Sequence, residues 1–286
     1  MDIVKRLLDA GFARVIALDA QDACGEQGTL LLAFMVYQAE KEPAVPGAWI
    51  HPYYDASQRA YHAAKQIAAE AVQLGLPVAL RDEIRLKPIF ARMPGFTQGR
   101  NTLTYAPGLG SRFHVQVLLT ADEITPDLQL EPVAHALHCG DCTRCMSACP
   151  TGAIDGEGYH RERCLRHWQM NGQPVPEEFR AKMGNRLLGC DECQRCCPHN
   201  LPPEGEAGEC VPVEDMLRRP KDMCALLRDR IGANLALPNR VLAQAGLMDD
   251  ARRSAACREA LQALTGHPSP TVRDHAAWAL AQDACD

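Results

Sequence analysis

The sequence predicts a mixed α/β region over residues 1–130, a cysteine-rich region over 131–205 and an all-helical region over 206–286. Three observations support this division. Apolar runs of strand length alternate with helical periodicity in the first region. Nine of the 14 cysteines crowd the second region, and repeated prolines interrupt helical segments in the third. With 286 residues the chain is long enough to bury a sizeable core.

The first region has the clearest periodic pattern. Helical spacing after Asp2 predicts an opening helix, and a longer helix is predicted from a cap at Ser57 to a stop at Gly75. Alternating polar and apolar residues near position 113 predict a half-buried strand. In chain order, helices are expected at 2–8, 57–74 and 83–92, and strands at 13–18, 30–37, 77–80 and 113–119.

Two cysteine runs that end in proline dominate the second region. The first reads Cys139-x2-Cys142-x2-Cys145-x3-Cys149-Pro150, the spacing of bacterial ferredoxins that bind [4Fe–4S] clusters. The second reads Cys190-x2-Cys193-x2-Cys196-Cys197-Pro198. Three thiolates spaced in this way can wrap one cubane from a tight loop, while the fourth faces a second cubane. The sequence therefore predicts a ferredoxin-like domain with two [4Fe–4S] clusters.

The spacing assigns most of the ligands, because in two-cluster ferredoxins the fourth cysteine of each run binds the other cluster. The first cluster is predicted to bind Cys139, Cys142, Cys145 and Cys197. The second is predicted to bind Cys149, Cys190, Cys193 and one further cysteine. Spacing leaves that last ligand open between Cys196, which completes a C-x2-C-x2-C run, and Cys164 in the linker between the runs.

Other roles for these cysteines fit the sequence less well. Disulfide frameworks belong to oxidising compartments and short secreted chains, whereas the opening residues MDIVKR begin no apolar signal segment. No apolar run approaches the length of about eighteen residues that a membrane span needs. Zinc ribbons also use C-x2-C pairs, but the third cysteine and the terminal Cys-Pro favour iron–sulfur. We expect a cytoplasmic chain with reduced thiols and no membrane partner.

The third region is predicted to consist of helices separated by prolines. Residues 271–281 (TVRDHAAWALA) resemble the second helix of a HEAT-type unit, and the length allows one or two such units. From residue 201 onward the net charge is −3, and the whole chain carries −6. Broad affinity for nucleic acid normally needs a basic face. The acidic balance therefore disfavours nucleic acid as a partner.

Longer motifs around the cysteines resemble those of a known family. They are CGDCTRC from residue 139, RCLRHW from residue 163, MGNRLLGCDECQ from residue 183, CPHN from residue 197 and HPSPTVRDHAAWAL from residue 267. In these motifs the chain resembles the epoxyqueuosine reductases, which are relatives of the corrinoid-dependent reductive dehalogenases. The resemblance is strong over residues 139–200 and diffuse elsewhere.

The resemblance implies an N-terminal α/β domain that holds base-off cobalamin, a double [4Fe–4S] domain and a HEAT-like C-terminal module. Electrons from a low-potential donor such as ferredoxin or flavodoxin would pass through both clusters to cobalamin. The family's reaction then removes the epoxide oxygen of epoxyqueuosine in tRNA and gives queuosine. The resemblance favours Cys164 as the open ligand and implies a carboxylate proton donor, for which Asp82 or Glu83 could serve and Asp82 is preferred. It places cobalamin beside Tyr61, His62, Arg100 and Asn101.

Three features favour a different substrate or role. Only 50 residues precede the His51-Pro-Tyr-Tyr motif, the match around Asp82 needs a gap, and the C-terminal region is acidic where a tRNA-docking module should be basic. One alternative is a reductase with the same cofactors and a small-molecule substrate. Another is a non-catalytic electron carrier that docks on a basic corrinoid protein, although carriage alone would not need an α/β domain.

Overall fold

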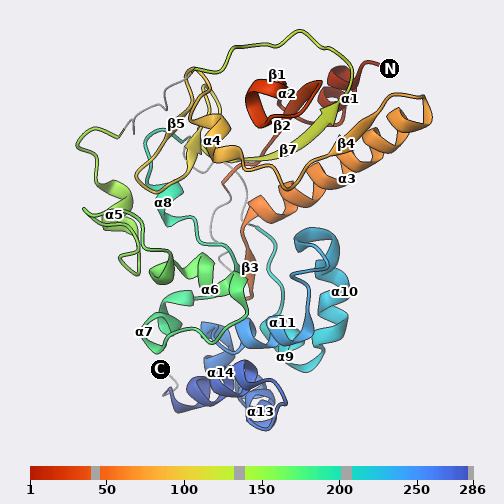
Figure 1. Cartoon of the computed structure of the whole chain (residues 1–286). Coiled ribbons are helices and arrows are strands. Elements are labelled where there is room, and N and C mark those ends of the chain that lie inside the picture. The colour runs from red at the N-terminus through yellow and green to blue at the C-terminus, as the bar shows by residue number, and fades with distance from the viewer. Residues whose placement is uncertain (40–45, 132–138, 201–207, 283–286) are drawn as a thin grey trace. The chain divides into compact units, whose positions relative to one another are not determined.

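A computed structural model gives the structure of the chain and describes residues 1–39, 46–131, 139–200 and 208–282 (Figure 1). The described residues form two compact units, which are treated separately below. The first unit draws on residues 1–38, 56–143 and 197–202, and the second on 39–55, 144–196 and 203–286. Because this division passes through the cysteine-rich segment, three successive domains at 1–130, 131–205 and 206–286 remain a prediction.

The first unit is built on a four-stranded antiparallel sheet in the order β1-β2-β7-β4. The expected strands are confirmed as β1 (Arg14–Asp19), β2 (Thr29–Val36), β4 (Val78–Leu80) and β7 (Phe113–Thr120). Strand β2 is buried on both faces, as its continuous apolar run predicts. One face, with Leu30, Leu32 and Phe34, packs against residues of β7, α2 and α4.

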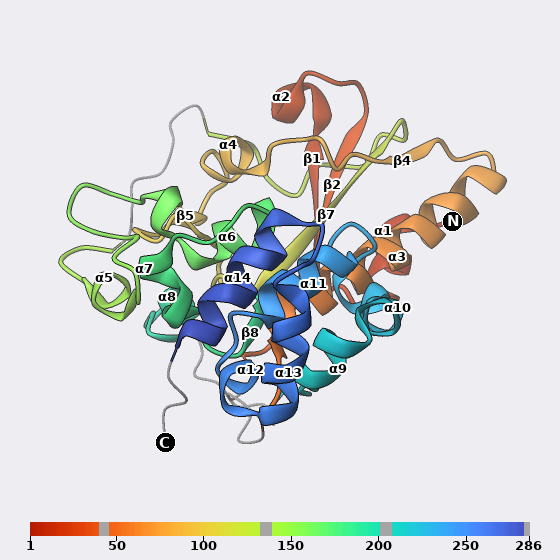
Figure 2. The same cartoon turned by 90° about the horizontal axis from the view of Figure 1, so that it is seen from below.

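Four helices belong to or enter this unit: α1 (Ile3–Asp9), α2 (Ala20–Cys24), α3 (Pro52–Gln73) and α4 (Leu86–Phe90). Asp2 caps α1, because its carboxylate accepts a 2.9 Å hydrogen bond from the N–H of Lys5. The expected start of the long helix at Ser57 is wrong, since α3 begins at Pro52. Proline suits a first helical turn because its φ is already helical and it has no N–H to satisfy. Figures 1 and 2 show α3 running along the sheet.

A small hairpin in the first unit has no counterpart among the predicted elements. Its strands, β5 (Thr97–Gln98) and β6 (Thr104–Tyr105), are too short to leave an alternating pattern. Its turn contains Thr102 at a φ of 62°, the only non-glycine residue at positive φ among the residues described. A β-branched residue is strained in that conformation. The contacts that hold the turn in place therefore carry information about its role.

The second unit is helical apart from a parallel pair of short strands, β3 (Trp49–Ile50) and β8 (Arg186–Leu188). The segments around its cysteines are α5 (Arg144–Ala148), the 3₁₀ turn η1 (Arg161–Arg163), α6 (Leu165–Asn171), α7 (Glu177–Arg180), η2 (Ala181–Met183) and α8 (Glu192–Arg195). The C-terminal helices are α9 (Val213–Arg218), α10 (Pro220–Ile231), α11 (Pro238–Ala245), α12 (Asp249–Arg253), α13 (Ala255–Leu264) and α14 (Pro270–Ala281).

One apolar core joins the two sets of helices in the second unit. Leu165 of α6 and Leu187 of β8 share it with Met216 of α9, Leu261 of α13 and Trp278 of α14. The helical C-terminal region is confirmed, and α14 covers the residues predicted to resemble a HEAT helix. Prolines open α10, α11 and α14 at their first turns, where proline is compatible with a helix. None of the described helices is both long and apolar enough to span a membrane.

Candidate iron–sulfur centres

Three of the four cysteines predicted for the first cluster lie in the first unit. Cys139 and Cys142 share a turn, in which the N–H of Cys142 donates to the carbonyl of Cys139 at 3.0 Å. Cys197 opens the last segment of the same unit, and Cys145 lies on α5 in the second unit. All four side chains are half-buried, as ligands at the edge of a domain should be.

The β5–β6 hairpin supplies hydrogen-bond donors to two of these thiols. The N–H of Arg100 donates to Sγ of Cys139 at 3.3 Å, and the hydroxyl of Tyr105 donates to Sγ of Cys197 at 3.1 Å. The side-chain amide of Asn101 in turn donates to the Tyr105 oxygen at 3.0 Å. Ligating sulfurs accept such bonds, so these donors suit metal-bound cysteines. Sequence reasoning missed Tyr105 altogether.

The four residues predicted to contact cobalamin fall in two places. Tyr61 and His62 lie on α3 with ring centroids 5.4 Å apart, and His62 is exposed. Arg100 and Asn101 lie in the hairpin turn, where Nη2 of Arg100 donates to the carbonyl of Gly140 at 3.0 Å and Asn101 is buried. Nε of Arg100 is buried and has no hydrogen-bond partner within the described part of the chain. One donor is thus left for a bound group, and contact with a corrin stays a prediction.

The cysteines predicted for the second cluster all lie in the second unit. Cys149 follows α5, Cys164 is the N-cap of α6, Cys190 follows β8 and Cys193 lies within α8. Sγ of Cys149 accepts a hydrogen bond from the N–H of Ala153 at 3.2 Å. The second unit therefore brings together residues that are far apart in sequence.

The pKa values of the Cys190 and Cys193 thiols are raised, and the charges of neighbouring cysteines contribute to this. Burial raises the pKa of the Cys190 thiol to about 12 and raises that of Cys193 well above its usual range. The negative charge of Cys164 raises the pKa of both, and that of Cys145 also acts on Cys193. Crowded, buried thiolates need a compensating cation, which a metal centre supplies. The donor set fits an iron–sulfur cluster.

Cys164 and Cys196 differ in their surroundings. Cys164 is close enough for its charge to act on both Cys190 and Cys193. Burial is the main cause that raises the pKa of Tyr159, and a hydrogen bond with Cys164 raises it further. The charge of Cys196 also acts on Cys193, but it is not among the charges that act on Cys190, and Sγ of Cys196 lies 3.6 Å from the carbonyl oxygen of Cys193. These surroundings favour Cys164 as the remaining ligand, an assignment that stays a prediction.

A single-ion site finds no support. Within residues 1–39, 46–131, 139–200 and 208–282 no three His, Cys, Asp or Glu side chains converge closely enough to bind one metal ion. In a cubane each thiolate binds a different iron, so the four sulfurs surround the core instead of meeting at one point.

The loop after β8 is held by contacts that position Cys190. The N–H of Gly189 donates to Oε1 of Gln169 at 2.8 Å, and a Cβ at Gly189 would lie 2.3 Å from Cβ of His51. Nε2 of His51 lies 3.6 Å from Oδ2 of Asp191, and both side chains are buried. Burial raises the pKa of Asp191, and the nearby Arg195 lowers it. The glycine and the His–Asp contact thus fix the backbone on both sides of Cys190.

Asp82, the predicted proton donor, lies in the turn after β4. Strands β4 and β7 pair with Leu80 opposite Leu118, and the N–H of Arg81 donates to the carbonyl of Val117 at 3.0 Å. Continuing this register brings Asp82 opposite Gln116, whose amide donates to its carboxylate. Gln116 is buried while Asp82 is exposed. The alternation of β7 could have identified Gln116 as the polar residue on a buried face.

Comparison with known proteins agrees with this geometry. Residues 138–200 match the family described as "4Fe-4S double cluster binding domain". Epoxyqueuosine reductase of Bacillus subtilis is 29% identical over 201 residues, covering 65% of this chain and 50% of the relative. That of Burkholderia pseudomallei is 34% identical over 221 residues, covering 64% and 52%.

The chain is a relative of the epoxyqueuosine reductases. It spans about half the length of the curated relatives that it matches. Epoxyqueuosine reductase from Streptococcus thermophilus has the same fold, with a TM-score of 0.72 at 20% identity over 98% of this chain and 88% of that one. An epoxyqueuosine reductase solved with a tRNA-Tyr stem loop also gives a TM-score of 0.72, at 18% identity over 98% of this chain and 88% of that one.

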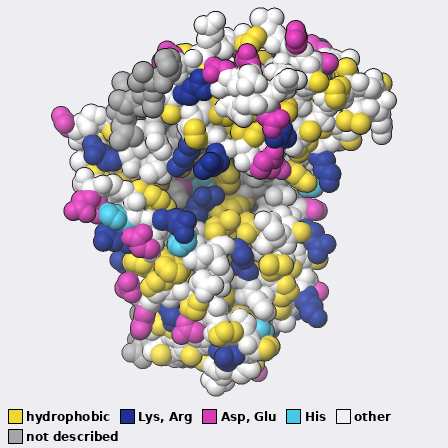
Figure 3. Space-filling view, viewed as in Figure 1, with side chains coloured by type: hydrophobic (Ala, Val, Ile, Leu, Met, Phe, Trp, Pro, Cys, Tyr) yellow, Lys and Arg dark blue, Asp and Glu magenta, His cyan; other side chains and the backbone are white. Residues whose placement is uncertain are grey.

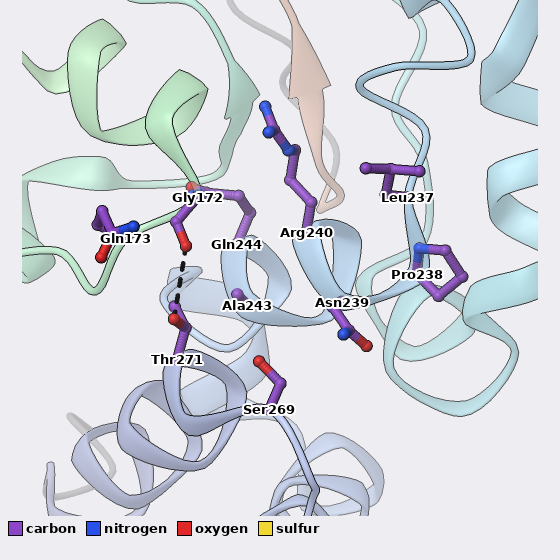
Figure 4. A pocket seen from close by; sticks show the side chains of 10 residues that line it. All are labelled: Gly172, Gln173, Leu237, Pro238, Asn239, Arg240, Ala243, Gln244, Ser269 and Thr271. Atoms are coloured by element: carbon purple, nitrogen blue, oxygen red, sulfur yellow. Dashed lines mark hydrogen bonds between the residues drawn. The ribbon is translucent and has the colours of Figure 1, made fainter.

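A pocket of about 400 Å³ in the second unit lies apart from the cysteines and from the residues predicted to contact cobalamin (Figure 4). Its walls come from the end of α6 and from the first turns of α11 and α14. The hydroxyl of Thr271 is 3.5 Å from the carbonyl of Gly172 across it. No cluster cysteine lines this pocket, so we assign it no part in electron transfer.

Proposed function

We propose that the chain is an iron–sulfur reductase that passes single electrons through two [4Fe–4S] clusters to a bound cobalamin. Its substrate in this proposal is an epoxide, namely epoxyqueuosine in tRNA. The observation that carries the proposal is the set of half-buried cysteines, several of which interact with one another, within the segment that matches a double-cluster domain. The clusters supply one-electron chemistry, and the chain holds them through the cysteines and the donors described above. A cytoplasmic location, which suits reduced thiols, belongs to the proposal.

Cobalamin binding is supported by the resemblance and by available donors. Tyr61 and His62 offer a ring edge on α3, and Arg100 offers an Nε that has no partner among the residues described. The test is anaerobic reconstitution with iron and sulfide, addition of hydroxocobalamin and gel filtration. We expect about eight irons and one co-eluting corrin per chain. Eight irons without a corrin would contradict the reductase and favour an electron carrier that serves a corrinoid protein.

Asp82 is proposed as the proton donor, with Gln116 as the residue that positions it. A solved epoxyqueuosine reductase from Bacillus subtilis has its catalytic aspartate loop swung out of the active site. In this chain the hydrogen bond from Gln116 and the ion pairs of Arg81 with Glu26 and Glu83 hold the turn that carries Asp82. We expect Asp82→Asn to abolish substrate turnover while iron content stays unchanged.

The neighbouring carboxylate gives a matched control for this test. Glu83 is exposed in the same turn, so Glu83→Gln removes one charge from the same place without touching the proposed acid. Turnover should fall less than about threefold in this control. Equal losses in Asp82→Asn and Glu83→Gln would remove the acid role from Asp82.

The tRNA substrate is proposed on the strength of the relatives, one of which was solved with a tRNA stem loop. The charge of this chain weighs against it, since acidic and basic side chains are interspersed over the C-terminal helices on the face in Figure 3. A direct test is turnover of an epoxyqueuosine-containing anticodon stem loop. Binding should weaken steeply as salt rises, because phosphate contacts release counterions. Turnover of free epoxyqueuosine with no binding of the stem loop would favour the small-molecule alternative.

The electron donor is proposed to be a low-potential carrier protein such as ferredoxin or flavodoxin. The clusters need single electrons at low potential, which carriers of this class supply. Reduction of the loaded chain by each carrier, followed optically under anaerobic conditions, tests this. If neither carrier reduces the clusters faster than free dithionite, the proposed partner is wrong.

A further inference from the structure

We propose that Tyr105 and Asn101 set the reduction potential of the cluster that Cys197 binds. The inference rests on the proposed clusters but on neither the corrin nor the substrate. It concerns residues of the first unit alone, which hold the hairpin, Cys139 and Cys197 together. Asn101 lies in the hairpin turn that was predicted to contact cobalamin, and Tyr105 lies beside that turn.

The Tyr105 proton is directed at the sulfur by the residues around it. Oδ1 of Asn101 accepts the N–H of Leu103 at 3.3 Å, which fixes Nδ2 as the end of the amide that faces Tyr105. Nδ2 donates to the Tyr105 oxygen at 3.0 Å, so the hydroxyl's own proton is free to point at Sγ of Cys197, 3.1 Å away. A cluster-bound thiolate has no proton of its own and accepts that bond.

The turn that carries Asn101 is built tightly enough to keep this geometry. Thr102 is held at a φ of 62°, and the N–H of Gly99 closes the hairpin on the carbonyl of Leu103 at 2.8 Å. A Cβ at Gly99 would lie 2.6 Å from Oδ1 of Asn101 and 2.7 Å from Cε2 of Tyr105. Strained backbone persists only where its surroundings over-determine it, and it clusters at functional positions.

The segment that follows Cys197 is held by residues just after the hairpin, at Gly110 and Ser111, and by the ring of Tyr105. Oδ1 of Asn200 accepts the N–H of Ser111 at 2.8 Å, and a Cβ at Gly110 would lie 2.5 Å from that oxygen. The rings of Tyr105 and His199 lie 5.9 Å apart, edge to face. Donor and sulfur are therefore both anchored, and their separation does not depend on the bond between them.

The direction of the effect follows from charge. On reduction a [4Fe–4S] cluster gains one electron, passing from a 2+ to a 1+ core, and part of the added negative charge falls on the ligating sulfurs. A hydrogen-bond donor to such a sulfur stabilises the reduced form more than the oxidised form and raises the potential. Losing the Tyr105 hydroxyl should therefore lower the potential of this cluster and leave the other cluster unchanged.

The test is an anaerobic potentiometric titration of the iron-loaded chain with dithionite as the one-electron source, followed by electron paramagnetic resonance. Tyr105→Phe removes the hydroxyl and keeps the ring. The titration should show two reduction waves, one for each cluster. At a fixed potential we expect the ratio of reduced to oxidised cluster to fall about threefold to tenfold in one of these waves. A tenfold change corresponds to about 59 mV for a one-electron couple.

A second variant and a control make the outcome decisive. Asn101→Asp keeps the acceptor for Leu103 but turns the group facing Tyr105 into an acceptor, which should draw the proton from the sulfur and lower the same wave. Tyr54→Phe removes a hydroxyl that bonds Sδ of Met170 at 3.4 Å, and should leave the wave of the cluster that Cys197 binds unshifted. Full iron content with unshifted waves in either loaded variant overturns the inference. If the unaltered chain binds no iron, the proposed function fails instead.

Discussion

His275 makes the stability of the second unit depend on pH below neutrality. The ring lies on α14, fully buried, where Nε2 accepts the N–H of Val175 at 3.0 Å and Nδ1 lies 2.8 Å from the carbonyl of Ala243. An acceptor role for Nε2 and a donor role for Nδ1 require the neutral ring. Burial lowers the pKa of His275 from 6.5 to about 4, with the charge of Arg180 lowering it and that of Asp274 raising it.

The sign and size of the effect follow from proton linkage. Between about pH 6.5 and 4 the unfolded chain takes up a proton at this residue and the folded chain does not, so stability falls as the pH is lowered. With a folded pKa of about 4, the loss between about pH 7.5 and 5.5 is about 1.3 kcal/mol. His275→Gln removes this titration and should also cost about 1–3 kcal/mol at neutral pH through its two hydrogen bonds.

Tryptophan fluorescence provides an assay confined to the second unit, because all 3 tryptophans, Trp49, Trp168 and Trp278, belong to it. Denaturant unfolding of the unaltered chain and of His275→Gln at both pH values gives a double difference in which the other titrating groups cancel. The stability gap between the two proteins should shrink by about 1.3 kcal/mol on acidification. A gap that is the same at both pH values would refute the linkage.

Three further outcomes are expected. Gly189→Ala places a Cβ 2.3 Å from Cβ of His51 at a φ of 91°. The variant should lose more than about 2 kcal/mol of unfolding free energy and should lose iron from the second cluster. A fully loaded, equally stable variant would contradict this. Cys164→Ser should lower the iron content from about eight to about four per chain while Cys196→Ser keeps about eight, and the reverse pattern would move the ligand to Cys196. Removing iron with a chelator should lower the melting temperature by about 5–10 °C, because ligation stabilises residues 139–197; superimposable melting curves would argue against it.

Periodic segments were predictable because their pattern is local. Strand β2 is an unbroken apolar run, and the cap of α1 by Asp2 needs only neighbouring residues. The start of α3 at Pro52 shows where such reasoning errs: Ser57 is a good cap residue, but a proline upstream also permits a helical first turn. The hairpin β5–β6 was missed because two-residue strands have no period to detect.

The double-cluster domain was predictable for a related reason, since a spacing rule expresses the local geometry of a loop around a cluster, while the assignment of each ligand stays a prediction. What a spacing rule lacks is the surrounding donors. The bond from Tyr105 to Cys197 joins residues 92 positions apart, and that from Arg100 to Cys139 joins residues 39 apart. Nothing in the intervening sequence encodes either contact. The family resemblance pointed to the same turn, at Arg100 and Asn101, for contact with cobalamin, which stays a prediction.

The β5–β6 turn limits which residues can contact both a cluster ligand and a corrin. Asn101 is buried and has both ends of its amide engaged, one with Leu103 and one with Tyr105, so it has little left to offer a second ligand. Arg100 differs, because its N–H bonds Cys139 while its Nε has no partner in the described structure. If a corrin binds beside this hairpin, Arg100 is the residue able to contact corrin and cluster ligand at once.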